Sequence, residues 1–574
     1  MRELKDYSEW KPILDYENES SYIEDSNRPW LKIKPSTVPK SIKFDPIPLH
    51  EFLKLSARKF PNNVLVYHKP TDKKYTYREL IYYADRIANA LNEWGVKKGD
   101  SIGLMSVNCP EFLFCVLGIL ETGAILVPIN PLLKESEVTH IIKETGNIKT
   151  VFVHKNNFRT IKKTRKEIEI ENVILLESEE AKPETITLEE FIDGKAAIPP
   201  NIDIDPINDV AVLLFTGGTT GLPKGVMLTH NNLVSNALSV LYNSDSSYEE
   251  VEEAKGTAVV LSILPLCHSF GFVVVNTAMF VTEMLVMFDS FEPSEILEAI
   301  EFYKVPLFVG VPVMYQMMIT HPDFTERDLS SIEGSVSSAA ALAPELAKKW
   351  EKRIGTKIGQ GYGLTEASPA THLPAAWLPE IKPESIGVPI LNTDSKIVNP
   401  DTLEEMKIGE VGEILIKGPQ VMKGYWNRPE ETKKDIVNGW LRTGDLGRMD
   451  ENGYFYIEGR TKDMIKYKGY KVMPKEVEEK LFEHPAIADV GVVGVPDPII
   501  GETIKAYVVL EKDYQGKITE REIIEWAKEQ LAGYKYPRKV EFIKSLPRTT
   551  IGKIYRRKLR EMEEEKQEKP LAPL

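Results

Sequence analysis

Residues 209–225 read DVAVLLFTGGTTGLPKG, an apolar run followed by a loop rich in glycine and hydroxyl side chains. The run Val210–Leu214 predicts a strand buried on both faces of an α/β sheet. In the loop, glycines let backbone amides approach oxyanions, hydroxyls donate hydrogen bonds and Lys224 adds positive charge. This combination predicts a polyphosphate-binding loop; a flexible surface loop is the alternative interpretation. The loop residues concerned are Thr216, Gly217, Gly218, Thr219, Thr220, Gly221 and Lys224.

The loop does not fit the two common nucleotide-binding patterns. A kinase-type loop places Gly before the lysine and Ser or Thr after it, whereas Lys224 follows Pro223 and precedes Gly225. The G-x-G-x-x-G dinucleotide fingerprint is missing from this segment as well. The sequence therefore predicts a phosphate site of another kind.

The loop resembles the phosphate-binding signature of the acyl-adenylate-forming superfamily, which holds acyl-CoA synthetases, luciferases and peptide-synthetase adenylation domains. Gly217 stands where many members have Ser, and the Gly-Gly form resembles the fatty-acid branch. The resemblance continues in order and covers the chain from about Leu49 to Arg560. The matching segments are PLCHSFG (265–271), QGYGLTE (360–366), TGD (443–445), GRTKDMIKYKGYKVMPKEVE (459–478) and PRTTIGKIYRRKLR (547–560).

The resemblance implies an α/β protein of two domains. The large N-terminal adenylate-forming domain, residues 1–460, would contain α/β sheets and a small β-rich subdomain, and the smaller C-terminal domain, residues 461–574, would be a mobile α+β unit. The hinge is expected near Lys462, in a turn-rich charged segment. Residues 1–48, punctuated by Pro and Trp, predict an extended arm over the larger body.

Local patterns predict individual elements. A capping box of Thr76 and Glu79, apolar residues at helical spacing and then Gly95 predict a helix. The dipeptide Asn452-Gly453 predicts a two-residue hairpin turn within an antiparallel region. Buried strands are predicted at 101–106, 149–155 and 209–215. Near the C-terminus, helices are predicted at 474–482 and 520–531, and strands at 488–495, 504–510 and 540–543.

Roles in nucleotide binding follow from the resemblance. Asp445 resembles the carboxylate that holds both ribose hydroxyls, Arg460 would assist it, and Tyr362 would stack on adenine. The segment Ser337-Ser338-Ala339-Ala340-Ala341 replaces the Ser-Gly-Ala-Ala-Pro that is frequent in the family, but it keeps small side chains that leave room for adenine. Besides the phosphate loop, the implied nucleotide contacts are Ser338, Ala339, Ala340, Gly361, Tyr362, Gly363, Thr365, Asp445 and Arg460.

Catalytic roles are implied for residues of both domains. Thr365 would hydrogen-bond a phosphate, and Glu366 would hold Mg²⁺. Lys553 would bridge the acid's carboxylate and the α-phosphate as charge builds in the transition state. Lys466 and the Gly469 loop would replace Lys553 when the small domain swings, and the Gly469 loop would form a thiol tunnel for coenzyme A. From the residues alone, Lys553 reads as a solvated lysine and Glu366 as a surface carboxylate.

The acyl pocket is expected around four positions. His268 resembles the residue at the pocket mouth, with a core histidine as the alternative. Val309, Met314 and residues 272–279 would line the pocket. Gly363 stands where acetate-specific relatives place a bulky Trp, so the cavity is expected to run deeper than two carbons. The alternative for Gly363 is a turn glycine that needs a positive φ.

The implied activity is that of an ATP-dependent, AMP-forming acid:CoA ligase acting on a medium- or long-chain fatty acid, with Mg²⁺, ATP and coenzyme A. Aryl acids and short hydroxy acids stay open as substrates. A luciferase-like or stand-alone adenylation enzyme and a non-catalytic nucleotide-binding regulator are the other classes. The presence of Lys553 and Glu366 argues against the regulator.

Composition limits the partners and the location. The formal net charge of -14, from 72 basic and 86 acidic residues, disfavours nucleic acid as a ligand. The apolar stretch 270–288 is interrupted by Asn276 and Glu283, which predicts a buried core segment rather than a membrane span. The charged N-terminus has no secretory pattern. Peripheral membrane contact and a homodimer stay open. A reducing cytoplasm is predicted because the cysteines suit neither a disulfide framework nor a zinc site; they are Cys109, Cys115 and Cys267.

Overall fold

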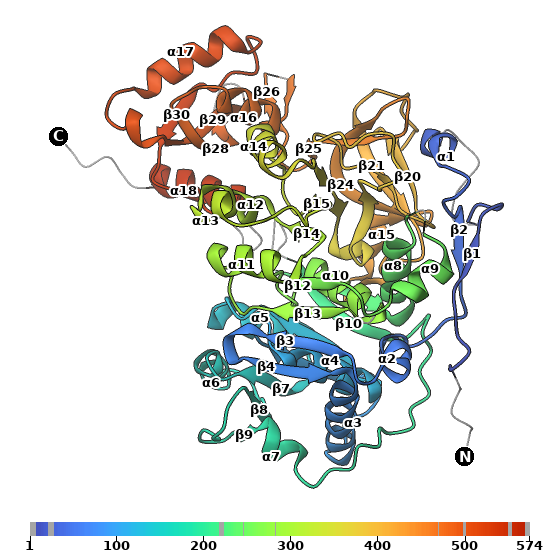
Figure 1. The fold of residues 1–574 in the computed structure, drawn as a ribbon. Helices are drawn as coiled ribbons and strands as arrows, with labels where there is room; N and C mark the ends of the chain where they lie inside the picture. The colour runs from blue at the N-terminus through green and yellow to red at the C-terminus, as the bar shows by residue number, and fades with distance from the viewer. Residues whose placement is uncertain are drawn as a thin grey trace.

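The computed structural model describes residues 7–20, 28–216, 223–244, 246–281, 283–468, 470–497, 501–548 and 554–568. Figure 1 shows a lower body of helices and sheets, a strand-rich subdomain at its upper right and the C-terminal elements at the upper left. The predicted class, a large α/β domain followed by a small C-terminal domain, is confirmed.

The largest sheet has eight strands in the order β22-β11-β10-β6-β5-β7-β8-β9. Strands β10 to β9 in this order are parallel, and β11 and β22 join antiparallel at one edge. The strands are β5 Ser101–Met105, β6 Ile125–Ile129, β7 Ile148–His154, β8 Asn172–Leu176, β9 Ile186–Thr187, β10 Val210–Thr216, β11 Lys224–Thr229 and β22 Gly424–Tyr425. Every residue of β5 and β6 is buried, as two-sided coverage requires.

Two smaller sheets complete the body. One has the order β12-β13-β3-β4 and the other β14-β15-β16. Their strands are β3 Val64–His68, β4 Lys73–Thr76, β12 Val259–Ser262, β13 Met284–Met287, β14 Leu307–Gly310, β15 Gly334–Ser337 and β16 Ile358–Gln360. The three predicted strands at 101–106, 149–155 and 209–215 correspond to β5, β7 and β10 and are confirmed.

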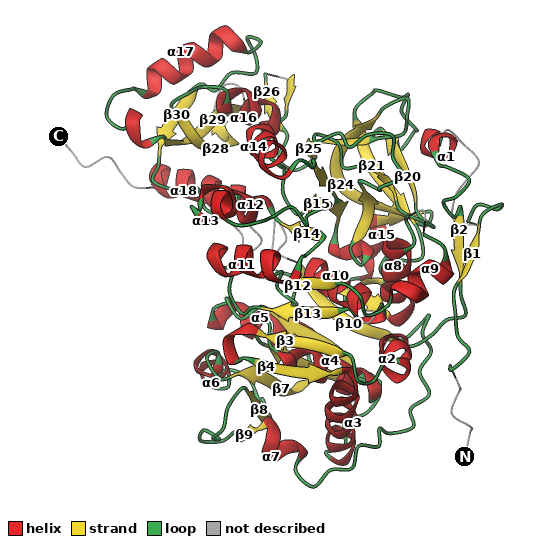
Figure 2. Ribbon diagram, viewed as in Figure 1, coloured by secondary structure: helices red, strands yellow, loops and turns green. Residues whose placement is uncertain are grey.

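Helices pack between and around these sheets (Figure 2). They are α2 Leu49–Lys59, α3 Tyr77–Glu93, α4 Pro110–Glu121, α5 Glu135–Thr145, α6 Phe158–Thr164, α7 Leu188–Ile192, α8 His230–Leu241, α9 Tyr248–Ala254, α10 Ser269–Phe280, α11 Pro293–Tyr303, α12 Pro312–Thr320, α13 Asp323–Glu326 and α14 Pro344–Ile354. The predicted capping box is present: the Thr76 hydroxyl accepts from Glu79 N–H, and the Glu79 carboxylate accepts from Thr76 N–H. One continuous apolar core joins α2, α3, α4, α8 and α10.

The apolar stretch 270–288 forms most of α10 and all of β13, and both are largely buried. The prediction of a buried core segment is therefore confirmed. Among the described residues, no helix has the length and apolar character that a membrane crossing demands. All three cysteines are buried and none is in a disulfide.

The strand-rich subdomain contains β17-β18-β19 and a second sheet, β20-β21-β24-β23, with β25 paired to β24. The elements are β17 Tyr362–Gly363, β18 Ala370–Leu373, β19 Val388–Pro389, β20 Asp394–Val398, β21 Gly412–Lys417, α15 Pro429–Asp435, β23 Ile436–Val437, β24 Trp440–Met449 and β25 Phe455–Arg460. The hairpin predicted from Asn452-Gly453 is β24–β25, but the two-residue turn is wrong. Residues 450–454 connect the strands, since Asp450 N–H donates to the Tyr454 carbonyl and Gly453, not Asn452, has a positive φ.

The C-terminal domain is a sheet in the order β27-β26-β29-β28, with β30 beside β29, and it has its own apolar core. Its elements are β26 Ile465–Tyr467, β27 Tyr470–Val472, α16 Pro474–Phe482, β28 Ile487–Asp497, β29 Gly501–Leu510, α17 Glu520–Gln530, β30 Lys539–Phe542 and α18 Arg556–Glu568. The helices and strands predicted between 474 and 543 are confirmed to within a few residues.

The described part of the N-terminal arm contacts both the body, where Trp10 packs against Phe52 and Phe280, and the strand-rich subdomain. It contains β1 Ile13–Asp15 paired with β2 Ser41–Lys43, and the short helix α1 Pro29–Ile33. Trp30 is 1% exposed and lies so close to the β24–β25 connection that a β-carbon on Gly453 would come within 2.4 Å of the Trp30 nitrogen. Arg28 donates to Asp394 in a buried ion pair.

Candidate active site

A cavity of about 2810 Å³ lies where the body, the strand-rich subdomain and the C-terminal domain meet. Parallel strands end at this cavity, which is the usual position of a ligand site in an α/β protein. The cavity brings together most of the predicted site residues that the structure describes. These are Thr216, Lys224, His268, Val309, Met314, Ser338, Ala339, Ala340, Gly361, Tyr362, Gly363, Thr365, Glu366, Asp445, Arg460 and Lys462. Gly217, Gly218, Thr219, Thr220, Gly221, Gly469 and Lys553 lie outside the described residues.

Asp445 is held between two hydrogen-bond donors. Tyr362 Oη donates to Asp445 Oδ2 at 2.6 Å, and Arg460 Nε donates to Oδ1 at 2.8 Å. The pairing of β24 with β25 places Asp445 opposite Arg460. Burial, reinforced by Asp445, raises the pKa of Tyr362, and Asp445 raises the pKa of Arg460. The arrangement keeps Tyr362 a neutral donor and fixes a carboxylate in the cavity wall.

Glu366 lies in a short 3₁₀ helix, η2 Thr365–Ala367, beside two groups that the sequence analysis missed. Tyr425 Oη lies 3.0 Å from Glu366 Oε1 and also 3.0 Å from Asp435 Oδ2, so one hydroxyl joins two carboxylates. Burial raises the pKa of Glu366. No local sequence signal marks this tyrosine, whose position comes from the pairing of β22 with β11.

Glu366 and Asp435 suit a magnesium ion that a nucleotide brings with it. Mg²⁺ prefers oxygen ligands and is usually held by one or two carboxylates together with phosphates and water. Among the described residues, no group of three or more His, Cys, Asp or Glu side chains forms a complete metal cage. The chain would therefore supply only part of the coordination, with phosphate oxygens supplying more.

Lys224 is the first residue of β11, and its ammonium group contacts an acidic side chain and an aromatic ring. Its Nζ forms an ion pair with Glu431 of α15 and lies 4.8 Å from the centre of the Tyr425 ring. The hydrogen bond from Lys224 lowers the pKa of Glu431. The lysine expected to face phosphate thus has a carboxylate partner of its own, which holds it at the cavity wall.

The segment expected to border adenine follows β15. Ser338 N–H donates to the Gly310 carbonyl, and Ala339 has a φ of +71°. A positive φ is uncommon for a residue with a β-carbon, and such strain clusters at functional sites. Ser338, Ala339 and Ala340 line the cavity, so the small side chains noted in the sequence do leave space there.

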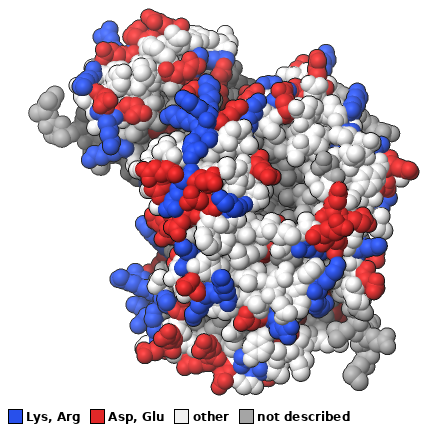
Figure 3. Space-filling model, viewed as in Figure 1, with Lys and Arg blue, Asp and Glu red and all other residues white. Residues whose placement is uncertain are grey.

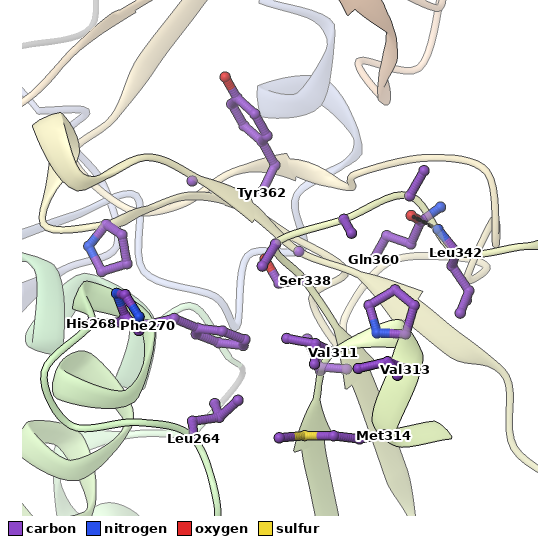
Figure 4. A pocket seen from close by; sticks show the side chains of 18 of the residues that line it. Leu264, His268, Phe270, Val311, Val313, Met314, Ser338, Leu342, Gln360 and Tyr362 are labelled. Carbon is purple, nitrogen blue, oxygen red and sulfur yellow. Dashed lines mark hydrogen bonds between the residues drawn. The ribbon is translucent and has the colours of Figure 1, made fainter. Parts of the chain in front are cut away.

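The apolar part of the cavity lies between two groups of side chains. Figure 4 shows Leu264 and Phe270 on one side and Val311 and Met314 on the other, with Tyr362 above them. The predicted lining by Met314 and Val309 agrees with this placement.

Only one face of α10 borders the cavity. Within the predicted lining segment 272–279, Val273, Val274, Thr277 and Ala278 border the cavity, and Ala278 also packs into the apolar core to which Phe272, Val275 and Met279 belong. The spacing is that of one helix face.

His268 precedes α10, and burial lowers the pKa of its imidazole. Its Nε2 lies 3.2 Å from Asn130 Nδ2 and it borders the cavity, so the core alternative does not describe its position. His230, in contrast, starts α8, and its Nδ1 accepts from Leu49 N–H inside the protein.

The prediction that a side chain at Gly363 would fill the cavity is wrong. A β-carbon there would lie 2.2 Å from the Pro369 carbonyl oxygen, because β17 and β18 approach closely at this point. Gly363 does border the cavity, but its missing side chain would point into the backbone of the neighbouring strand. The alternative is also wrong, since Gly363 is not among the glycines with positive φ.

The C-terminal domain turns a particular surface toward the cavity. Arg548 and Ile554, which flank residues 549–553, line the cavity together with part of α16. Lys466, on β26, is exposed and does not line it, and its backbone N–H donates to Glu502. Lys462 borders the cavity in the connection between β25 and β26.

The fold and the arrangement of Tyr362, Asp445, Arg460 and Glu366 around one cavity are those of an adenylate-forming enzyme. Residues 53–426 match the family model described as AMP-binding enzyme, and residues 476–553 match the AMP-binding enzyme C-terminal domain. The chain therefore belongs to this family, and the resemblance noted in its sequence is confirmed.

Relatives define the class further. The chain is 38% identical over 566 residues to the long-chain-fatty-acid–CoA ligase of Bacillus subtilis (strain 168), covering 94% of this chain and 99% of that protein. It is 35% identical over 505 residues to the feruloyl-CoA synthase of Amycolatopsis sp, covering 88% and 96%. The solved structure of ATP-bound MatB from Rhodopseudomonas palustris matches with a TM-score of 0.80 at 29% identity, covering 90% of this chain and 99% of that chain.

These findings place the chain among the AMP-forming acyl- and aryl-CoA ligases, for which ATP and coenzyme A are co-substrates and Mg²⁺ accompanies the nucleotide. The two relatives are named for an aliphatic and an aromatic acid respectively.

Proposed function

We propose that this ligase activates a medium- or long-chain aliphatic acid and transfers it to coenzyme A. The acid's carboxylate oxygen attacks the α-phosphorus of ATP, pyrophosphate leaves, and an acyl-adenylate forms. The thiolate of coenzyme A then attacks the acyl carbon, and AMP leaves with the electron pair of the broken C–O bond. No covalent bond to the protein is needed.

The cavity along α10 carries this proposal. Ser269, the first residue of α10, lies with its Oγ 3.3 Å from Thr365 Oγ1, so the helix begins beside the residue that we assign to phosphate. One face of the helix then borders the cavity as far as Val281. At about 1.5 Å per residue, the 12 residues of α10 span about 18 Å. An extended hydrocarbon advances about 1.3 Å per carbon, so this length suits a chain of about fourteen carbons.

The walls along this path are apolar, which suits a hydrocarbon better than a polar acid. The lining residues beside α10 come from the end of α8 and from the start of β12. They are Val240, Leu241, Ala258, Val259, Val260 and Leu261. Each methylene buried against such walls contributes about 0.8 kcal/mol.

The nucleotide would lie at the opposite end of the path. Asp445 would accept hydrogen bonds from the ribose hydroxyls, and Tyr362 would pack against adenine. Glu366, with Asp435 nearby, would hold Mg²⁺, which would offset phosphate charge, and Thr365 would donate to phosphate. Lys553 would stabilise the charge that develops between carboxylate and α-phosphate.

The two half-reactions require different groups, and a domain rotation about Lys462 would exchange them. We assign residues 1–460 and 461–574 to the two bodies. The orientation described here suits adenylation, because Arg548 and Ile554, on either side of the segment that contains Lys553, line the cavity while Lys466 does not. In the second orientation, Lys466 and the Gly469 loop would approach the adenylate.

The test is a panel of acids incubated with the protein, ATP, Mg²⁺ and coenzyme A, with AMP and thioester measured together. The panel contains saturated acids from acetic to octadecanoic, and ferulic and 4-coumaric acids. We expect the highest kcat/KM between ten and sixteen carbons. A preference for ferulic or 4-coumaric acid would overturn the proposal in favour of an aryl-CoA ligase, and AMP without thioester would indicate an adenylating enzyme of another kind.

A further inference from the structure

The path along α10 ends at a single acidic side chain. Glu283 follows α10 directly before β13 and lines the same cavity as Val281 and Ala278. The other lining residues near this end are apolar, apart from Thr277, whose hydroxyl donates to the Val273 carbonyl of its own helix. A carboxyl group therefore stands at the far end of an apolar channel.

The Glu283 carboxyl has no hydrogen-bond or ion-pair partner within the part of the chain that the structure describes. Tyr77 Oη donates to the backbone carbonyl of Glu283, not to its side chain. Lys255, at the end of α9, forms an ion pair with Glu252 and donates to Ser56 Oγ instead. Burial alone raises the pKa of Glu283 to about 7.

Glu283 is half-buried, and a polar group partly withdrawn from water without a partner is destabilising, so a ligand that supplies the missing hydrogen bond is stabilised. A terminal methyl group cannot supply one, whereas a hydroxyl can. A neutral carboxyl both donates and accepts and a carboxylate accepts, so a hydroxyl pairs with Glu283 in either state.

We propose that Glu283 is a specificity-determining residue, which selects aliphatic acids carrying a hydroxyl group at the far end of a chain of about fourteen carbons. This inference rests on the proposed function, because it assumes that an aliphatic chain occupies the path along α10. The acid's carboxylate lies at Thr365 and its terminal hydroxyl reaches Glu283. A chain of eight carbons ends well before this residue and is indifferent to it.

The experiment compares tetradecanoic, ω-hydroxytetradecanoic and octanoic acids with the wild-type protein, Glu283→Leu and Glu283→Gln. The quantity measured is the ratio of kcat/KM for the hydroxylated acid to that for the plain acid of equal length. Leucine removes the hydrogen-bonding group. Glutamine keeps both the shape and a hydrogen-bonding group, and it serves as the matched control for folding and packing.

We expect Glu283→Leu to lower this ratio about tenfold, equivalent to about 1.4 kcal/mol, while Glu283→Gln keeps most of it. The kcat/KM for octanoic acid should stay within about twofold in all three proteins, which also reports an intact reaction centre. An unchanged ratio in Glu283→Leu overturns the inference, and so does an equal loss for all three acids.

Failure of the proposed function would look different. In that case the wild-type protein itself would turn over neither octanoic nor tetradecanoic acid in preference to aromatic acids. If aliphatic acids are good substrates and only the ratio fails to respond to Glu283→Leu, the proposed function stands and this inference falls.

Discussion

Gly363 is packed against β18 so closely that a single added carbon would collide with backbone. We expect Gly363→Ala to lose about 2 to 3 kcal/mol of stability, because the neighbouring backbone cannot move aside as a side chain can. Activity should fall for every acid alike. Urea denaturation and an acid panel measure the two effects.

Gly533 offers the matched control, since a β-carbon there meets nothing within 4 Å. Gly533→Ala should leave stability and activity within experimental error. A shift of Gly363→Ala toward short acids, without loss of stability, would contradict the packing argument and restore this glycine as a determinant of chain length.

Glu283 should make the stability of the protein depend on pH. Its pKa is raised from an unfolded value of about 4.3 to about 7 in the fold. The folded state therefore holds a proton that the unfolded state releases, and stability falls as pH rises from about 4.3 to about 7. Glu283→Gln removes this loss, so we expect it to stabilise the protein more at pH 8 than at pH 5, by about 2 kcal/mol.

Thermal or urea unfolding at both pH values measures the difference. The exposed Glu253 supplies the control, because Glu253→Gln should show the same small effect at pH 5 and pH 8. Equal stabilisation by Glu283→Gln at the two pH values would show that this carboxyl titrates normally in the folded protein.

At the level of the element, the length of α10 that borders the cavity should determine the longest hydrocarbon chain that the site accepts. Val274 and Ala278 are four residues apart on the face that borders the cavity, a distance of about 6 Å along the helix axis. A phenylalanine at either position should block the path at its own depth. We expect Val274→Phe to limit the acid to about six carbons and Ala278→Phe to about ten, from the same rise per residue.

Competition between hexanoic, decanoic and tetradecanoic acids in each variant gives the limits directly. Hexanoic acid should remain a substrate of Ala278→Phe at close to the wild-type kcat/KM. If the two variants show the same limit, or lose all acids equally, the chain does not run along α10.

The helices and strands could be predicted from the sequence where local signals are strong. The capping box of Thr76 and Glu79 predicts the start of α3. Continuous apolar runs, typical of strands buried on both faces, predict β5, β7 and β10. The two-residue turn predicted from Asn452-Gly453 is wrong, and Trp30, more than four hundred residues earlier, packs against the longer connection found there. Local chemistry cannot report such a distant contact.

In the candidate site too, residues within sequence motifs could be predicted, whereas residues placed by tertiary packing could not. Residues in ordered motifs, such as Asp445 and Glu366, were identified from the sequence and do border one cavity. Tyr425 and Asp435 were missed, because strand pairing and the placement of α15 bring them to Glu366 and no spacing in the sequence records this. Glu283 appeared only as an interruption in an apolar run.

At the scale of the whole molecule, the face in Figure 3 carries both acidic and basic side chains, which gather in groups of either sign. The predictions of a homodimer and of peripheral membrane contact stay predictions.

The proposed rotation of the C-terminal domain about Lys462 can be tested with variants of two lysines. Lys553→Ala should abolish ATP–pyrophosphate exchange but spare thioester formation from supplied acyl-adenylate, by the loss of one charge from the first transition state.

Lys466→Ala should impair thioester formation from supplied acyl-adenylate but largely spare ATP–pyrophosphate exchange, because that lysine is assigned to the second orientation. Exchange assays and direct thioester assays with synthetic acyl-adenylate separate the two half-reactions. Equal losses in both half-reactions for both variants would contradict the assignment of the two lysines to different orientations.

The N-terminal arm sets an order of events during synthesis. Arg28 is the partner of Asp394, which is 366 residues further along the chain. A ribosome adding about 5 to 20 residues per second needs roughly 20 to 70 seconds to cover this distance. During that interval the first parallel strands can assemble, while Trp30 stays exposed to chaperones and proteases. The segment around Trp30 is therefore among the last to be buried, and a proteolytic cut near Trp30 should occur on nascent chains far more readily than on the finished protein.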